Sequence, residues 1–133
     1  MALMKLEIVT PDRSFFSGDV KGVLLKGPEG LFEILPRHTA YVGTLVPSSI
    51  KLITQEGDKT AFLSSGFVEV SKDKTTIVAD TAEWPEEIDI GRAKSAQHRA
   101  EERLRNKSDI DVERARLALS RALARQRTSS HSR

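Results

Sequence analysis

One phrase, Ile-Asp-x-x-Arg-Ala, occurs twice in the chain, at residues 88–93 and again 22 residues later at residues 110–115. Each copy opens a stretch that is rich in Ala, Arg and Glu and free of proline, a composition typical of helices. Residues 106–109 (NKSD) separate the two stretches, and Ser108 or Asp109 is placed to cap the second helix. Because so short a turn makes two helices antiparallel neighbours, residues 88–127 are predicted to form a helical hairpin.

Small apolar residues recur at helical spacing along both stretches. They are Ala93, Ala96, Ala100 and Leu104 in the first, and Val112, Ala115, Leu119 and Ala122 in the second. Alanine allows helices to approach closely but buries little area, so self-packing contributes only about a few kcal/mol at about 25 cal/mol per Å². We therefore expect the hairpin to be held by another part of the chain, or to be able to leave it. The polar tail, residues 128–133, is predicted to be disordered.

The first part of the chain carries the pattern of β-structure. From residue 3 to residue 79, short apolar runs are separated by turn signals such as residues 27–30 (GPEG) and 56–58 (EGD). Eight or nine strands of this kind predict an antiparallel sandwich or barrel. The side chains predicted to face its core are Leu25, Leu35, Leu45, Ile53, Leu63, Val68, Val70 and Val78. Pro85 disfavours helix at Trp84, so residues 80–87 form a joint and the first helix follows them.

Charge is distributed unevenly between the two parts. Residues 1–87 hold 9 Lys/Arg against 13 Asp/Glu, whereas residues 88–133 hold 12 against 6. An acidic body with a basic hairpin suggests that the hairpin meets something negative, although Arg-rich helices also serve simply as soluble helices. The chain has no cysteine, which fits a reducing compartment, and no apolar run long enough for a signal peptide or a membrane span. Any membrane association is expected to come through a partner.

The residues offer no catalytic constellation. There is neither a phosphate-binding loop of the form G-x-x-x-x-G-K-[ST] nor a dinucleotide-binding G-x-G-x-x-G. The histidines, His38, His98 and His131, are far apart in sequence, which argues against a zinc site. Glu86 and Glu87 precede a helix, where acidic side chains favour the helix dipole. The chain is therefore predicted not to be an enzyme.

Four arginines suggest a binding site instead. Arg92 and Arg99 lie seven residues apart on one face of the first helix, and Arg121 and Arg125 lie four apart on the second. In a closed hairpin the start of the first helix faces the end of the second, so the four guanidinium groups could converge on one anion such as a phosphate. The alternative is that they point to water and pair with Glu101, Glu102 or Glu113.

Over nearly its full length, the chain resembles the epsilon subunit family of bacterial F-type ATP synthases. The resemblance is carried by residues 6–11 (LEIVTP), 30–38 (GLFEILPRH), 66–70 (GFVEV) and 88–93 (IDIGRA), followed by the basic helical pair. It implies an α+β fold: an N-terminal antiparallel β-sandwich, residues 1–84, and a C-terminal antiparallel two-helix hairpin, residues 85–133. The implied role is that of a non-catalytic rotor subunit coupling proton translocation to ATP synthesis.

The resemblance also implies partners and a location. The sandwich is expected to bind the gamma subunit and the c-ring, and the extended hairpin to contact the alpha and beta subunits and inhibit ATP hydrolysis. The protein would sit at the cytoplasmic face of the cell membrane, as a peripheral part of the complex. The alternative from another class is a nucleic-acid-binding module built on the basic hairpin. The acidic body and the low aromatic content of 5% argue against that alternative, so no nucleic acid partner is expected.

Many bacterial members of this family bind ATP as a regulatory ligand in the folded state, and the resemblance carries that site over residue by residue. Ile88, Asp89 and Ala93 would meet the adenine side, and Glu83 would lie near the ribose or base. The residues that would face the phosphates are Arg92, Arg99, Arg121 and Arg125. Whether Mg²⁺ accompanies ATP is left open, and no catalytic cofactor is expected. Gly91 departs from the family pattern and costs roughly 1 kcal/mol relative to alanine in a helix, which puts the affinity in doubt.

Overall fold

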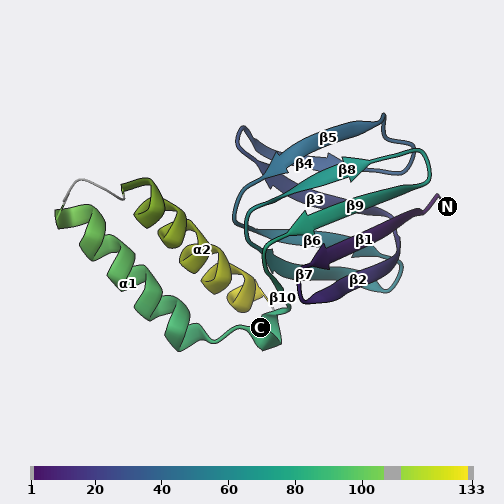
Figure 1. Ribbon diagram of the computed structural model, residues 1–133. Helices are drawn as coiled ribbons and strands as arrows, with labels where there is room; N and C mark the ends of the chain where they lie inside the picture. The colour runs from purple at the N-terminus through teal and green to yellow at the C-terminus, as the bar shows by residue number, and fades with distance from the viewer. Residues whose placement is uncertain (1, 107–111, 132–133) are drawn as a thin grey trace.

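The computed structural model describes residues 2–106 and 112–131. Within them the chain forms ten strands, a short 3₁₀ turn and two long helices (Figure 1). The strands are β1 Met4–Thr10, β2 Arg13–Val20, β3 Gly22–Gly27, β4 Gly30–Ile34, β5 Tyr41–Leu45, β6 Ser48–Thr54, β7 Gly57–Leu63, β8 Gly66–Val70, β9 Lys74–Ala79 and β10 Ala82–Glu83. The 3₁₀ turn is η1 Pro85–Glu87, and the helices are α1 Ile90–Asn106 and α2 Val112–His131.

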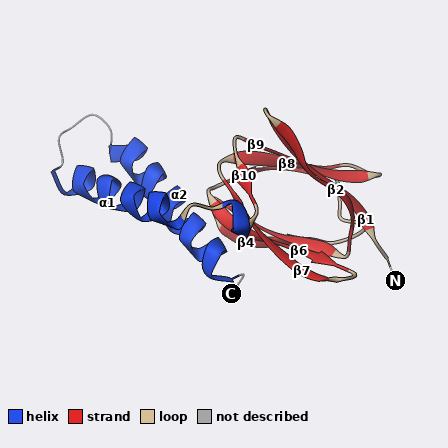
Figure 2. Cartoon of the chain, turned by 90° about the horizontal axis from the view of Figure 1, so that it is seen from below, coloured by secondary structure: helices blue, strands red, loops and turns tan. Residues whose placement is uncertain are grey.

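The strands form two five-stranded sheets that lie face to face, as Figure 2 shows. One sheet has the order β2-β1-β9-β8-β5 and the other β10-β7-β6-β3-β4. All pairs are antiparallel except β1 with β9, which run parallel from Lys5 beside Lys74 to Val9 beside Val78. The predicted α+β fold, with an N-terminal β-sandwich and two C-terminal helices, is confirmed.

The core lies between the two sheets. Among the side chains predicted to face it, Leu25, Leu45, Leu63, Val68 and Val70 are buried. Three were placed wrongly: Leu35 is 48% exposed, and Ile53 and Val78 are only partly buried. In each case the residue one position earlier is fully buried instead, namely Ile34, Leu52 and Ile77. A shift of one residue along a strand moves a side chain to the opposite face.

The joint between sandwich and hairpin is more ordered than the sequence suggested. After β9, the two-residue strand β10 pairs with the end of β7, with Ala82 opposite Leu63. Trp84 is extended, with ψ of 157°, and Pro85 then opens η1, as expected for a residue that disfavours helix before it. Ile88 is extended too, so α1 begins at Ile90 and not at Ile88, where the sequence had placed the helix start.

The two helices form an antiparallel hairpin whose second helix packs on the sandwich. In Figure 1, α2 lies between α1 and the sheets, and its contacts are with β6, β7 and η1. The alanines Ala93, Ala100, Ala115 and Ala122, all predicted for the apolar stripe, are buried. No helix within the described residues is long and apolar enough to span a membrane.

The prediction of a disordered tail from residue 128 is wrong for residues 128–131. They continue α2 as far as His131, and Thr128 and Ser129 are buried. The Thr128 hydroxyl donates a hydrogen bond to the Ala124 carbonyl at 2.9 Å, which satisfies its polar group inside the helix. The predicted turn and cap at Ser108 and Asp109, and the last two residues of the tail, lie outside the described residues.

Candidate functional site

A cavity of about 840 Å³ lies where the hairpin meets the joint, between β10, η1, α1 and α2. Its lining residues are Glu83, Glu87, Asp89, Gly91, Arg92, Ala93, Ser95, Ala96, Arg99 and Arg125. Three arginines and three carboxylates thus line one cavity, so charged side chains are prominent in the site. Among the described residues, no three His, Cys, Asp or Glu side chains gather closely enough to hold a metal ion.

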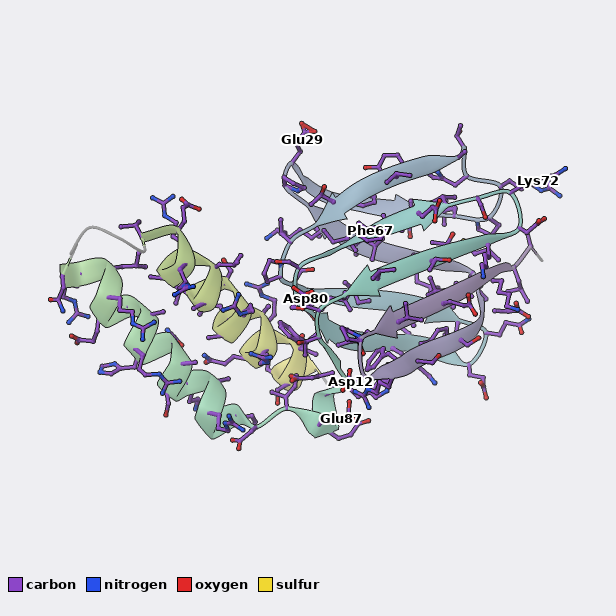
Figure 3. The ribbon with its side chains drawn as sticks, in the orientation of Figure 1. Asp12, Glu29, Phe67, Lys72, Asp80 and Glu87 are labelled. Carbon is purple, nitrogen blue, oxygen red and sulfur yellow. The ribbon has the colours of Figure 1, made fainter. Side chains whose placement is uncertain are left out.

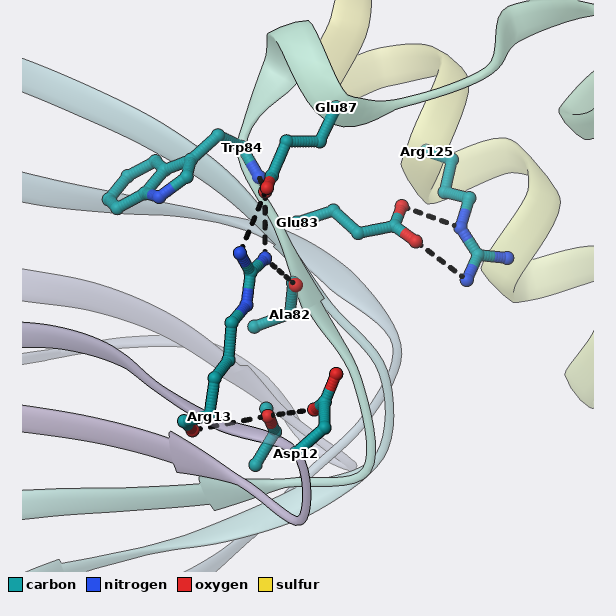
Figure 4. Close-up of polar contacts among 8 residues, drawn as sticks. Asp12, Arg13, Ala82, Glu83, Trp84, Glu87 and Arg125 are labelled. Carbon is teal, nitrogen blue, oxygen red and sulfur yellow. Dashed lines mark hydrogen bonds and ion pairs between the residues drawn. The ribbon is translucent and has the colours of Figure 1, made fainter.

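The last turns of α2 bring Arg125 to the edge of the sandwich. Its Nε donates to Glu83 Oε1 at 2.9 Å, and its Nη2 donates to Glu83 Oε2 at 3.4 Å (Figure 4). The guanidinium carbon also lies 4.5 Å from the centre of the Phe62 ring, a cation–π arrangement. Phe62 is fully buried beside Ile88 and Ala124. This small apolar cluster, together with the ion pair, attaches α2 to the sandwich.

The first turn of α1 presents a second group of cavity residues. Asp89 precedes the helix, and its Oδ1 accepts a hydrogen bond from the Arg92 backbone N–H at 3.1 Å, which makes Asp89 the N-cap. Arg92 and Arg99, seven residues apart, both line the cavity and both have exposed side chains. Ala93, between them, is buried. The lining that α1 contributes to the cavity therefore consists of two arginines and the small residues Gly91, Ala93, Ser95 and Ala96.

A bidentate ion pair holds the joint on the sandwich. The Arg13 guanidinium donates to both carboxylate oxygens of Glu87, at 2.8 and 2.9 Å, and to the Ala82 carbonyl at 3.0 Å (Figure 4). Glu87 also accepts from the Trp84 backbone N–H at 2.8 Å. The hydrogen bonds from Arg13, and then the one from Trp84, hold the pKa of the Glu87 carboxyl below its ordinary value. The Trp84 ring stacks on Phe15, with the ring centroids 4.2 Å apart.

The structure brings together six of the eight residues expected to bind ATP. Those lining the cavity are Glu83, Asp89, Arg92, Ala93, Arg99 and Arg125. Ile88 does not line the cavity and is buried in the cluster with Phe62. Arg121, one turn before Arg125 on α2, does not line it. Glu102 and Glu113, which the alternative interpretation paired with these arginines, instead pair with Arg105 and Arg116, and Arg125 pairs with Glu83.

Other residues of the site were not foreseen. Ser95 and Ala96 line the cavity, and their spacing of three and four residues from Arg92 was the signal that could have found them. Glu87 was interpreted only as a charge near a helix start, whereas it lines the cavity and binds Arg13. Nothing in the sequence links Phe62, on β7, to Arg125 on α2.

A second surface lies at the edge strands β4 and β5. A groove of about 720 Å³ is lined there by Leu31, Phe32, Tyr41 and Val42, among others. Leu31 is 67% exposed and Val42 68%, and contiguous exposed apolar side chains mark interaction surfaces. On the neighbouring strand β8, Phe67 is also exposed, and Figure 3 shows it on the outer face of the sheet. Apolar side chains thus gather on this part of the sandwich.

Comparison with known families gives two matches. The beta-sandwich domain of the ATP synthase Delta/Epsilon chain matches residues 3–85, and the long alpha-helix domain of the same chain matches residues 86–130.

Individual proteins agree with these families. The chain is 49% identical to the ATP synthase epsilon chain of Clostridium novyi over 122 residues, which cover 91% of this chain and 93% of that one. It is 44% identical to the ATP synthase epsilon chain of Clostridium kluyveri over 124 residues, 92% of this chain and 94% of that one. Among solved structures, a chain of the Euglena gracilis mitochondrial ATP synthase superposes with a TM-score of 0.80 at 21% identity, over 93% of this chain and 79% of that one. At this identity the likeness concerns the fold alone.

Proposed function

This chain belongs to the ATP synthase delta/epsilon family, and from that premise we propose that it is the rotor-stalk epsilon subunit whose hairpin regulates ATP hydrolysis. As a member of the family it is a non-catalytic subunit of the ATP synthase. In the proposed role the sandwich couples proton translocation to ATP synthesis as part of the rotor. The hairpin inhibits hydrolysis when it extends, and ATP holds it in the folded state. Family membership favours this function over the nucleic-acid-binding module considered from charge alone.

The observation that supports a mobile hairpin is how little attaches it to the sandwich. Most of the buried side chains lie within the sandwich cluster, whereas a separate cluster of Phe62, Ile88 and Ala124 joins the two parts. The interface between the helices is lined by alanines, which bury little area. A conformational switch requires two arrangements whose free energies differ by only about a few kcal/mol. A hairpin attached in this way is suited to docking and release.

ATP fits this scheme as a ligand of the folded arrangement. The cavity takes its walls from the joint and from both helices, so a molecule bound there would contact parts that separate when the hairpin extends. Arg92, Arg99 and Arg125 supply donors for phosphate oxygens. A ligand that binds only the folded arrangement stabilises it by RT ln(1 + [L]/Kd). ATP would then be an effector and not a substrate.

The partner surfaces follow from exposure and charge. The exposed apolar side chains around the groove of β4 and β5, including Leu31 and Val42, suit the gamma subunit and the c-ring of the rotor. The basic hairpin suits an acidic region on the beta subunits, with the alpha subunits beside it. In this assignment the protein lies at the cytoplasmic face of the cell membrane, as a peripheral member of the complex.

The test is a calorimetric titration of ATP into the pure protein, with Arg92→Ala beside it. Wild type should bind saturably, and Arg92→Ala should weaken binding about tenfold or more, because a charge-assisted hydrogen bond to phosphate is lost. Lys94→Ala is the matched control, since Lys94 is exposed on the same helix but does not line the cavity. Arg121→Ala tests the one predicted arginine outside the cavity, and little change is expected.

Two other outcomes are informative. Saturable binding that Arg92→Ala leaves unchanged would keep ATP as an effector but move its site away from α1. Absence of binding at millimolar ATP would remove ATP from the scheme and leave the hairpin governed by its protein partners.

A further inference from the structure

One ion pair connects the sandwich to the hairpin from within the cavity. Glu83 belongs to β10, on the sandwich, and Arg125 to α2, on the hairpin; two hydrogen bonds, of 2.9 and 3.4 Å, join them. The two side chains are only 24% and 27% exposed, so water screens this pair less than it screens ion pairs on the outer surface. Figure 4 shows the two carboxylate oxygens of Glu83 facing one edge of the Arg125 guanidinium.

Glu83 differs from the other two carboxylates of the cavity. Glu87 is occupied by Arg13, which does not line the cavity, and Asp89 caps the backbone of α1. Glu83 alone among the three has an ion-pair partner that is itself a cavity arginine, among the residues that the structure describes. An anionic ligand therefore competes with one carboxylate of the protein for one guanidinium.

Arg125 cannot easily serve both partners at once. Its guanidinium carbon is held 4.5 Å from the Phe62 ring centre, over a fully buried side chain, which fixes where the donors point. The Nε and Nη2 donors that make up one edge of the guanidinium both go to Glu83. A bidentate contact from a phosphate to that edge requires the carboxylate to leave.

From this arrangement we propose that Glu83 is an internal competitor for the anion site: it holds α2 on the sandwich when the cavity is empty, and it releases Arg125 when a polyphosphate binds. The inference rests on the proposed nucleotide site and assigns Glu83 a different role from the contact with ribose or base that the family resemblance implied. Ligand binding then replaces the ion pair between Glu83 and Arg125 with a contact between Arg125 and the ligand. The loss of the ion pair lowers the net affinity for the ligand. The docked hairpin does not depend on the ligand alone.

The proposal makes opposite predictions for docking and for affinity. Glu83→Gln removes the negative charge but keeps the shape, so the empty hairpin should undock more often, by about fivefold, as expected for a partly exposed ion pair. The same substitution should lower the Kd for a polyphosphate about fivefold, after correction for the docked fraction. A residue that only stabilises the fold would not improve binding.

The experiment uses the full chain with two dyes. Because the chain has no cysteine, Lys72→Cys and Arg103→Cys give two labelling sites. Lys72 lies at the end of the sandwich far from the hairpin (Figure 3), and Arg103 is exposed on α1. Energy transfer between the dyes measures the docked fraction, first without ligand and then during titration. Two ligands are titrated, ATP and inorganic tripolyphosphate. Glu86→Gln is the matched control, since Glu86 is an exposed carboxylate of the same joint and forms no hydrogen bond or ion pair within the described residues.

The two ligands separate the competing roles of Glu83. A competitor for Arg125 predicts tighter binding of both ATP and tripolyphosphate in Glu83→Gln. If Glu83 instead binds the ribose or base, the substitution weakens ATP and leaves tripolyphosphate unchanged, which overturns the proposal. A docked fraction and affinities equal to those of Glu86→Gln overturn it as well.

Failure of the nucleotide site is distinguishable from failure of this proposal. If the wild type binds neither ligand, the proposed nucleotide site is wrong. Glu83→Gln then still decides the present inference: undocking of the empty hairpin together with newly gained tripolyphosphate binding supports it, and the lack of either overturns it.

Discussion

Gly66, the first residue of β8, shows how a single position can be fixed by its neighbour in a sheet. A Cβ atom added there would lie 2.8 Å from the Ala79 Cα and closer still to the Val78 carbonyl oxygen, both backbone atoms of the paired strand β9. Gly66→Ala should therefore destabilise the protein by about 1–3 kcal/mol, because the strands must separate to admit the methyl group. Urea denaturation followed by fluorescence of Trp84, the one tryptophan, measures this loss.

Gly91→Ala is the control for that measurement. The nearest atom to an added Cβ is Asp89 Oδ1 at 3.4 Å, an ordinary contact, and the residue lies in the first turn of α1. Alanine should stabilise the helix by up to about 1 kcal/mol. An unchanged stability in Gly66→Ala would contradict the packing argument, and a large loss in Gly91→Ala would mean that the helix start tolerates no side chain.

The same scale shows where sequence reasoning reached its limit. Alternation along β6 and β9 predicted strands correctly, but the core side was misjudged at Ile53 and Val78. In both strands two large aliphatic residues are adjacent, so alternation alone cannot say which one faces inward. The pairing decides: Leu52 lies opposite Val23 and Lys59, and Ile77 opposite Ile8 and Val68. Such partners come from distant parts of the chain.

At the scale of elements, η1 is the point where the hairpin is fixed to the sandwich. Arg13 from β2 forms an ion pair with Glu87 of η1, and the pKa of Glu87 lies below its ordinary value of 4.5 mainly because of that contact. A carboxyl whose pKa is lowered by folding stabilises the protein at pH values above its pKa in the unfolded chain. This contribution is lost as the pH falls through its pKa in the folded protein. The Arg13 and Glu87 side chains are 39% and 36% exposed, so solvent screening keeps the contribution to about 0.5–1 kcal/mol.

This gives a prediction for acid. The difference in unfolding free energy between wild type and Glu87→Gln should be about 0.5–1 kcal/mol at neutral pH and should shrink toward zero below about pH 4. Urea denaturation from pH 7 to pH 3 measures it. The pKa of Glu7 is also lowered, by its hydrogen bond with Lys74, but this residue is common to both proteins and its contribution cancels in the difference. Glu86→Gln should show no such pH dependence, and a difference that persists in acid would mean that Glu87 acts through packing.

Elements differ in how far the sequence reveals them. The helices were predictable because the repeated motif and the alanine spacing extend over many residues. By contrast, β10 has two residues and η1 has three, which is too short for any periodicity to appear. The end of α2 was misjudged because Thr128 and Ser129 look like a polar tail, and only their place beside the sandwich buries them. The place of Arg92 and Arg99 on one face of α1 was predictable from spacing, whereas the pairing of Glu83 with Arg125 depends on how the hairpin docks.

At the scale of the whole molecule, the sandwich and the hairpin differ in how many buried apolar side chains stabilise them. The sandwich holds a continuous cluster from Leu6 to Ala82, with Trp84 packed against it. Among the described residues, the hairpin has a line of buried alanines and the contacts of α2 with β6, β7 and η1, which include Phe62 and Glu83. Most of the buried apolar side chains that stabilise the chain therefore lie in the sandwich. The proposed role, in which the sandwich stays on the rotor while the hairpin moves, requires such a division.

Truncation after Glu87 tests this division directly. The shortened chain keeps the sandwich cluster and the Arg13–Glu87 ion pair, and it loses Ile88 and Ala124 from above Phe62. We expect it to remain folded, with a loss of about 1–3 kcal/mol from exposing one aromatic side chain, measured by urea denaturation. Added to an ATP synthase catalytic sector that lacks this subunit, it should compete with the full chain for binding but should not inhibit ATP hydrolysis. Inhibition equal to that of the full chain would move the regulatory element out of the hairpin, and loss of competition by a folded sandwich would move the rotor contact into it.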